Sequence, residues 1–301
     1  MSMGLNVAKI EEVFGTKPEL FPDEGVVKVS FPRTDLKVAI DRKAMKPFLG
    51  LTSWVSFQKG SKEGVEVMLM GDLCLLEDEV NSSMSVALEN SIDVTALHNH
   101  FFFDDPKVYF MHISGEGKLE KVALGVRATL DSIRAFRTRS PHRLSGFGGQ
   151  EPDAEDRIDG GPLQEILGNS GQAKDGMFKI VIGRQTRAEC GCVVGKNMGI
   201  NTWAAFSGSN ERALVCGDFA LLERELQQVL KSLRGGGINV VAIHNHMILE
   251  RPRFVFIHYW GKGRSADLAE VLRGALDKTS DTALTHDADI PHVHKHSNSQ
   301  S

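Results

Sequence analysis

Apolar and polar residues alternate in a way that predicts several strands and two helices in the first half of the chain. The strand-like runs are rich in Val, Ile, Phe and Leu and end at turn residues, whereas the helix-like runs repeat apolar residues every three or four positions. This order predicts an α+β fold, a mostly antiparallel sheet covered by helices. The predicted strands are residues 26–31, 36–40, 53–58, 65–76, 94–101 and 107–113, and the predicted helices are residues 77–90 and a segment from 118.

The second half repeats this order because the chain contains an internal duplication. Residues 69–131 align with residues 215–277 at an offset of 146 without a gap, and 21 of the 63 aligned pairs are identical. The match predicts two tandem homologous units. A segment rich in Gly, Pro and charge separates them, and the polar end of the chain is typical of disorder. The predicted divisions are a first unit at 1–137, a linker at 138–162, a second unit at 163–280 and a disordered, histidine-rich tail at 281–301.

Composition places the chain among ordinary globular proteins. Its 301 residues are 41% apolar and 25% charged, with a formal net charge of -4. Lys and Arg are spread along the chain, which argues against a nucleic-acid-binding surface. The first residues lack an export-signal pattern, and no apolar stretch approaches the roughly 18 residues of a membrane span. We therefore expect a cytoplasmic protein with reduced thiols and with neither nucleic acid nor membrane as a partner.

Histidines form the chemically informative pattern. Each unit carries an H-N-H segment on one predicted strand and a third histidine on the next, and the positions match between the copies. Residues i and i+2 of a strand share a face, so imidazoles would gather on one side of the sheet. Neutral imidazoles suit a transition metal ion such as Zn, Fe or Mn, whereas histidines that only donate hydrogen bonds in a polar groove are the alternative. The predicted metal ligands are His98, His100, His112, His244, His246 and His258.

The turn after each H-N-H segment sets how these histidines would meet. If the first hairpin is centred on Asp105, His112 lies directly opposite His98 and beside His100. The second copy predicts the same arrangement about Arg251.

Acidic residues of the repeated motif G-D-x-x-L-L-E-x-E offer a further ligand or a general base. Acids at the start of a helix are also routine partners of the helix dipole, so capping is the alternative. The candidate proton carriers are Glu77, Glu79, Glu223 and Glu225, and Asp72 and Asp218 are further candidates in the same motif.

Two smaller features complete the pattern. Trp54 and Trp203 occupy matching positions and are expected to seal each core, with an aromatic pocket wall as the alternative. Cys190 and Cys192 form a C-x-C pair in the second copy only, and without a second cysteine pair they are expected to be strand residues and not a zinc knuckle.

The segments ALHNHFFFDDPKVYFMHISGEG and AIHNHMILERPRFVFIHYWGKG, together with GLTSW and GINTW, give the chain a family resemblance. It resembles the LppY/LpqO family, a duplicated bacterial domain family of unknown function, over about residues 5 to 278. The resemblance implies the layout in two units and adds no reaction. The members that gave that family its name are exported lipoproteins, and this sequence lacks their export signal and lipobox cysteine.

The pattern favours a metal-dependent enzyme acting on a small molecule, and it leaves hydrolytic, lyase and oxygen-using chemistry open. The alternative is a non-catalytic protein that binds a small ligand in a histidine-lined groove. The sequence leaves open whether the repeats form one composite site or two, and a homodimer is compatible with it.

Overall fold

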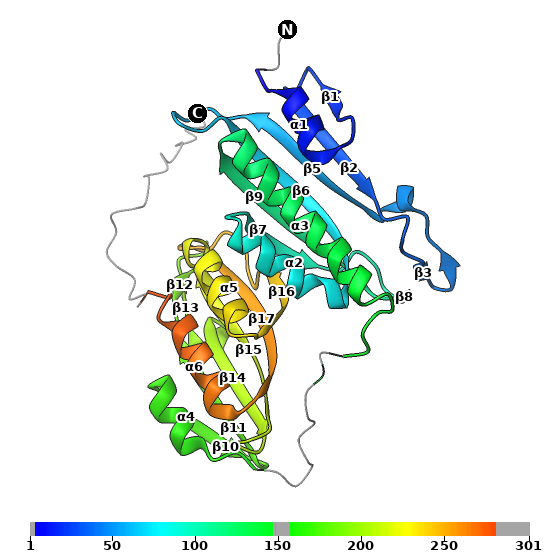
Figure 1. Ribbon diagram of the computed structural model, residues 1–301. Coiled ribbons are helices and arrows are strands. Elements are labelled where there is room, and N and C mark those ends of the chain that lie inside the picture. The colour runs from blue at the N-terminus through cyan, green and yellow to red at the C-terminus, as the bar shows by residue number, and fades with distance from the viewer. Residues whose placement is uncertain (1–3, 147, 149–156, 281–301) are drawn as a thin grey trace, which may run out of the picture.

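A computed structural model describes residues 4–146, 148 and 157–280, and in these residues two α+β units share one sheet (Figure 1). The strand order is β1-β2-β5-β6-β9-β7-β16-β17-β15-β14-β11-β10, with every adjacent pair antiparallel. The first six strands in this order belong to the first unit and the last six to the second. The predicted fold class is confirmed. The predicted tail at 281–301 and residues 147 and 149–156 of the predicted linker lie outside the described residues.

The first unit contains the predicted helices and strands with two differences. The strand predicted at 94–101 ends at His98, and the strand predicted at 36–40 is only two residues long. The elements of this unit are α1 Val7–Phe14, β1 Glu19–Phe21, β2 Val26–Pro32, β3 Ala39–Ile40, β4 Lys43–Ala44, the 3-10 helix η1 Pro47–Leu49, β5 Thr52–Lys59, β6 Val67–Leu76, α2 Glu77–Glu89, β7 Asp93–His98, β8 Asp104–Asp105, β9 Val108–Gly117 and α3 Leu119–Arg139.

The second unit repeats the sequence of elements. Within the described residues, no helix has the length and apolar character that a membrane crossing requires. The elements are α4 Gly160–Leu167, β10 Gly171–Lys174, β11 Met177–Gly183, β12 Thr186–Arg187, β13 Val193–Val194, η2 Lys196–Met198, β14 Asn201–Gly208, β15 Ala213–Leu222, η3 Glu223–Glu225, α5 Leu226–Gly235, β16 Asn239–His244, β17 Phe254–Gly263 and α6 Ser265–Leu276.

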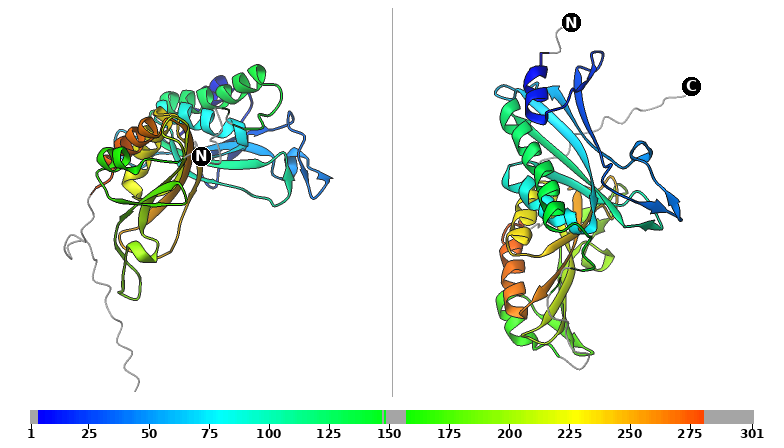
Figure 2. Two further views of the ribbon diagram at one scale, coloured as in Figure 1. Left: turned by 90° about the horizontal axis from the view of Figure 1, so that it is seen from below. Right: turned by 45° about the vertical axis from the view of Figure 1, so that its right-hand side comes forward.

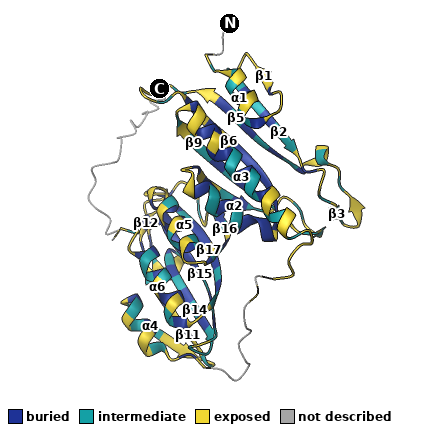
Figure 3. Ribbon diagram, viewed as in Figure 1, coloured by how far each residue is buried: buried dark blue, intermediate teal, exposed yellow. Residues whose placement is uncertain are grey.

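All the long helices cover the same face of the sheet, and the strands of the two units bend away from this helical layer (Figure 2). Alternate residues of β6 point to the two faces of the sheet. Leu69 and Leu73 are buried in the main core beneath the helices, whereas Met68 and Met70 are exposed on the opposite face. Figure 3 shows buried residues along the central strands and on the sheet-facing sides of the helices. The sheet therefore has one face packed against the helices and one helix-free face that is exposed in part.

The seam between the units is one antiparallel contact, Leu97 of β7 opposite Ile243 of β16. Two side-chain amides extend it. Asn81 of α2 donates to the Val240 carbonyl at 3.2 Å and accepts from its N–H at 2.8 Å. At the matching position of α5, Gln227 makes the same pair of bonds to Val94, at 2.9 and 3.0 Å. Each amide satisfies backbone groups that the short strand contact leaves unpaired.

Buried ion pairs hold the start of α2 and its copy. Both Glu79 oxygens are engaged: Arg33 donates at 2.9 and 3.0 Å, Arg137 at 3.0 Å and the Leu76 N–H at 2.9 Å. In the second unit Glu225 accepts from Arg184 at 2.6 and 3.1 Å. Burial alone would raise the pKa of Glu225, but hydrogen bonds from Arg184 and Ser280 overcome it and lower this pKa to about 2.

Replacing the seam amide should weaken the whole fold. Asn81→Ala leaves the buried N–H and carbonyl of Val240 without partners, so we expect the free energy of unfolding to fall by about 2 kcal/mol. Urea denaturation measures this, with the exposed Asn197→Ala in η2 as a control expected to change it by less than about 0.5 kcal/mol. An unchanged denaturation midpoint for Asn81→Ala would show that the amide does not hold the seam.

Glu79→Gln should be strongly destabilising because it leaves two arginines facing a neutral partner. Removing one member of a buried ion pair costs about 3 to 5 kcal/mol of unfolding free energy. Chemical denaturation of this variant is compared with that of Glu77→Gln, whose side chain is exposed and whose expected loss is less than about 0.5 kcal/mol. Equal losses in the two variants would contradict the assigned role.

The stability contributed by Glu225 should depend on pH. Its pKa is lower in the folded chain than the ordinary value of 4.5, so its contribution is complete above pH 4.5 and is lost as the pH falls toward about 2. Between these values we expect the unfolding free energy of Glu225→Gln to fall less steeply than that of the wild type. Urea titrations across this pH range test it, with the exposed Glu223→Gln keeping the wild-type slope.

Candidate metal centre

The first candidate site lies on the helix-free face of β6, β9 and β7. Leu97, Met111 and Leu73 point into the main core, so their neighbours His98, His112 and Asp72 point to the opposite face. Asp72 stands directly opposite His112 in the β6–β9 ladder. The copies Asp218, His258 and His244 occupy β15, β17 and β16 in the same way, with Asp218 opposite His258. The sheet thus gathers two histidines and an aspartate in each unit.

The register of the hairpin differs from the expectation. His98 faces Phe110 and His112 faces Ala96, so the two histidines are diagonal neighbours and not a directly opposed pair. The second unit shows the same shift, with His244 opposite Phe256. The reason is that Asp104–Asp105 pairs with β3 as β8, so the connection is not a tight turn centred on Asp105. Farther from the turn, a bulge between Val94 and Ala96 shifts the register of β7 once more.

The diagonal arrangement still brings the rings together. The His98 and His112 rings stack with centroids 5.1 Å apart, and those of His244 and His258 are 4.6 Å apart. The expected shared face is therefore present on the strands.

His100 and His246 lie beyond the ends of β7 and β16, and not on the strands that the sequence predicted. Each ring instead stacks on a phenylalanine of the neighbouring strand. The His100 ring stacks on Phe110 at 3.4 Å, and the His246 ring stacks on Phe256 at 3.5 Å. His246 Nδ1 also lies 3.3 Å from the Gly199 carbonyl oxygen. Stacking turns each third imidazole back toward the strand histidines, with centroids 5.1 Å from His98 and from His244.

A buried aspartate lies beside the imidazoles in each unit. The side chains of Asp72 and Asp218 are only 9% and 4% exposed. Asp218 Oδ2 lies 3.4 Å from His246 Nε2, and Asp72 Oδ2 lies 4.0 Å from His112 Nε2. The Oδ1 atom of each aspartate is buried and makes no hydrogen bond. An unpartnered buried carboxylate oxygen is costly unless a cation or a water satisfies it.

Burial favours the neutral form of three of the imidazoles. It lowers the pKa of His244 to about 4, with His258 and His246 adding to the effect, and it also lowers the pKa of His98 and of His100. Neutral imidazole is the form that binds metal ions. Burial raises the pKa of Asp218, while the neighbouring His258 and His246 act against the shift.

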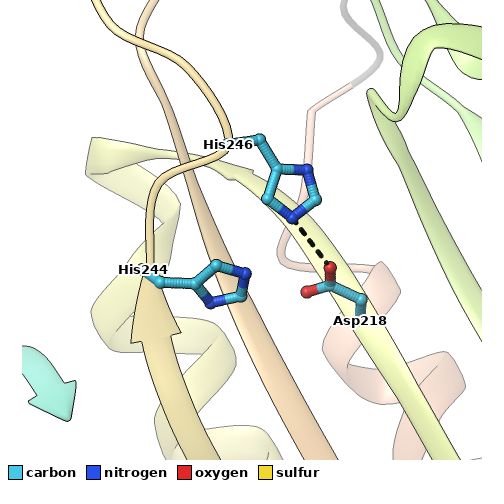
Figure 4. A group of neighbouring side chains, drawn as sticks. All are labelled: Asp218, His244 and His246. Carbon is cyan, nitrogen blue, oxygen red and sulfur yellow. Dashed lines mark ion pairs between the residues drawn. The ribbon is translucent and has the colours of Figure 1, made fainter.

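The second unit has the tighter group of donors. Asp218, His244 and His246 each offer a ligand atom, and these atoms lie within 4.8 Å of one another (Figure 4). His258 stands at the side of this group, with Nδ1 3.9 Å from Asp218 Oδ1 and 47% of its side chain exposed. His244 Nδ1 is also buried without a partner. Two imidazoles and one carboxylate therefore face a common space.

The four glutamates proposed as proton carriers occupy other positions. Glu79 and Glu225 are held by arginines and backbone N–H groups, which favours the capping interpretation. Neither oxygen of Glu79 is free for proton transfer. Glu223 is 59% exposed beside Arg253, and Glu77 is exposed at the start of α2. Within the part of the chain that the structure describes, none of the four joins the donor group. The acid that meets the histidines is the aspartate of the same motif.

The tryptophans do not seal the core. Trp54 and Trp203 stand opposite Asp72 and Asp218 in the sheet, so they share the helix-free face with the histidines. Lys28 Nζ lies 4.7 Å from the Trp54 ring centre. Each tryptophan therefore lies on the histidine face, directly across the strand pair from the aspartate of its unit.

Apolar side chains project from the loop that follows each H-N-H segment. Phe102 and Phe103 are 86% and 85% exposed, and the matching Ile248 and Leu249 are 76% and 59% exposed. Phe103 and Leu249 both adopt positive φ, at 59° and 66°, a conformation that such residues rarely take. Both units therefore present an apolar surface close in sequence to their histidines.

The two sites lie on one face of one sheet. Leu97 and Ile243 pair across the seam and share the core side, so His98 and His244, one residue further along each strand, both point to the helix-free side. Each aspartate approaches histidines of its own unit. The arrangement is two groups of histidines, each with an aspartate, on one face of the sheet.

Comparison with known proteins identifies one family and a few solved structures with low similarity to this chain. A search of curated proteins finds no match. The trimeric bacterial microcompartment shell protein PduB is 13% identical over 86% of this chain and 88% of its own, with a TM-score of 0.20. The ethanolamine utilization protein EutL from Leptotrichia buccalis is 10% identical over 73% of this chain and 83% of its own, with a TM-score of 0.20. TM-scores this low support no argument about fold or assembly.

The family match covers both units. Residues 8–132 and residues 161–278 both match the same family, which agrees with the duplication. The name LppY/LpqO is not part of the match, so that resemblance stays an expectation. The chain belongs to the family described as Domain of Unknown Function (DUF1259).

Proposed function

We propose that the protein is a metal-dependent enzyme that acts on a small molecule, with one metal centre in each unit. The observation that carries the proposal is the buried Oδ1 atom of Asp72 and of Asp218, which makes no hydrogen bond although each carboxylate lies beside imidazoles. A cation would satisfy this oxygen. The same feature occurs at matching positions of both units, which supports a retained chemical role.

The donor set narrows the class of ion. In the second unit Asp218, His244 and His246 supply one carboxylate and two imidazoles. This set is typical of mononuclear non-haem iron sites and resembles the three-ligand zinc sites that keep an open position for water or substrate. Zn, Fe and Mn fit these ligands. In the first unit the corresponding donors are Asp72, His98 and His100.

A bound ion would polarise an oxygen of the substrate, lower the pKa of a coordinated water or, if it is iron, take part in oxygen chemistry. The remaining steps belong to the side chains. His258, beside the donor group and half exposed, is the base best placed to carry a proton to solvent, and His112 is its copy. Trp203 and the exposed apolar loop residues would hold the organic part of the substrate.

The proposal predicts bound metal that depends on the aspartates. The full-length chain should be purified without metal-affinity chromatography and with the tail histidines replaced (His286→Ala, His292→Ala, His294→Ala and His296→Ala). Elemental analysis should find about two equivalents of a transition metal, one for each three-ligand site. Asp218→Asn and Asp72→Asn should each remove about one equivalent, because a neutral amide is a weaker ligand than a carboxylate.

Glu223→Gln is the matched control, since its side chain is exposed and lies outside the donor group, and it should keep the full metal content. Metal that disappears with the tail histidines alone, or that survives both aspartate substitutions, would contradict the proposal. That outcome would favour a non-catalytic protein that binds a small ligand in a histidine-lined groove.

A further inference from the structure

Two exposed cysteines, separated by a single residue, lie at the tip of the β12–β13 hairpin. Cys190 and Cys192 were expected on a strand, but they lie in the turn between the two short strands. Both are exposed, whereas Cys74 is buried and Cys216 is partly buried. The pair thus differs from the other two cysteines in facing solvent together.

The turn that carries the thiols is held by three hydrogen bonds. The Ala188 N–H donates to the Cys192 carbonyl at 2.9 Å, and the Gly191 N–H donates to the Ala188 carbonyl at 2.8 Å. Arg187 Nη1 donates to the Gly191 carbonyl at 2.8 Å. Gly191 has a φ of 85°, which a glycine adopts without strain. The turn therefore presents both cysteines from a fixed backbone.

The two cysteine side chains interact across Gly191. The backbone N–H and the thiol of Cys192 both hydrogen-bond to Cys190, and these bonds lower the pKa of the Cys190 thiol. The same contact raises the pKa of Cys192. Because the closed turn places both exposed thiols at one hairpin tip, they can bind one ion together without unfolding the hairpin.

The number of ligands indicates which ion would bind. Among the described residues, the only group of three or more such donors is Asp218, His244 and His246, so the thiol pair has no third protein ligand beside it. Structural zinc sites need four ligands, whereas soft thiolates also select copper(I). We propose that Cys190 and Cys192 form a two-thiolate site for a soft monovalent metal ion of the copper(I) class. Binding replaces the two S–H protons, which pass to water, and leaves the oxidation state of the metal unchanged.

The hairpin is fixed to the loop that follows the second H-N-H segment. Arg187 and Arg251 exchange two backbone hydrogen bonds, at 3.0 and 2.8 Å, and Thr186 Oγ1 donates to the Pro252 carbonyl at 2.7 Å. In the first unit the matching β3–β4 turn carries Asp41 and Arg42 and no thiol. The thiol site is therefore specific to the second unit and uses none of the donors of the metal centre proposed above.

Copper(I) titration of the full-length chain tests this site. In anaerobic, reducing buffer with a copper(I)-specific chelator as competitor, the wild type should bind one equivalent at the turn. Cys190→Ser and Cys192→Ser should each weaken copper(I) binding on the order of 100-fold or more. Each variant loses the second thiolate, which the turn holds at a high effective concentration beside the first. The substitutions lie at an exposed hairpin tip, so the thermal unfolding midpoint should not change.

Cys216→Ser is the matched control and should bind copper(I) as the wild type does. Affinity equal to wild type in either turn variant, or copper(I) that is lost when the tail histidines are replaced, would overturn the proposal. Failure of the wild type to compete with the chelator after complete reduction would overturn it as well. The aspartate variants Asp72→Asn and Asp218→Asn should retain this copper(I), which separates the test from that of the histidine centres.

Discussion

The antiparallel contact of β7 with β16 is the constraint on which the rest of the structure depends. A single residue pair, Leu97 with Ile243, joins two half-sheets, and Asn81 and Gln227 supply the backbone hydrogen bonds that the diverging strands do not make. Because the paired residues share a face, the contact also fixes the side to which both sets of histidines point. It places the helices of both units over one core, and the opposite face carries the histidines and aspartates beside two smaller apolar clusters.

Buried carboxylates fall into two kinds in this protein. Glu79 and Glu225 have arginine partners that satisfy their charge, and they hold the ends of strands to the helical layer. Asp72 and Asp218 are also buried, but each keeps one oxygen without a hydrogen bond beside imidazoles. The glutamates already have all the partners that their buried charge requires. The aspartates need a cation or an ordered water to offset the cost of burying an oxygen without a hydrogen bond. This difference separates the structural acids from the candidate site within one short sequence motif.

The units have kept their geometry while their surfaces have diverged. The third imidazole of each stacks on the matching phenylalanine, and the apolar loop residues recur as aromatic side chains in one unit and aliphatic ones in the other. The thiol pair is present in the second unit alone. Such divergence around a shared framework is compatible with one chemical role in both sites and an added role at the second hairpin.

The sequence by itself determined the duplication, most of the strands and helices, and the six histidines, because periodicity and repeated motifs are properties of local order. It also predicted a shared face for His98 and His112 from a hairpin centred on Asp105. His112 faces Ala96 instead of His98, and because this shift is an even number of residues, the two histidines keep the same face. Only the tertiary structure decided the register between β7 and β9, which the pairing of β8 with β3 displaces from the tight hairpin. It likewise decided which acid joins the histidines. Arg33 and Arg137, distant along the chain, engage Glu79, while the β6–β9 ladder places Asp72 opposite His112, and contacts between distant residues leave no periodic signal in the sequence.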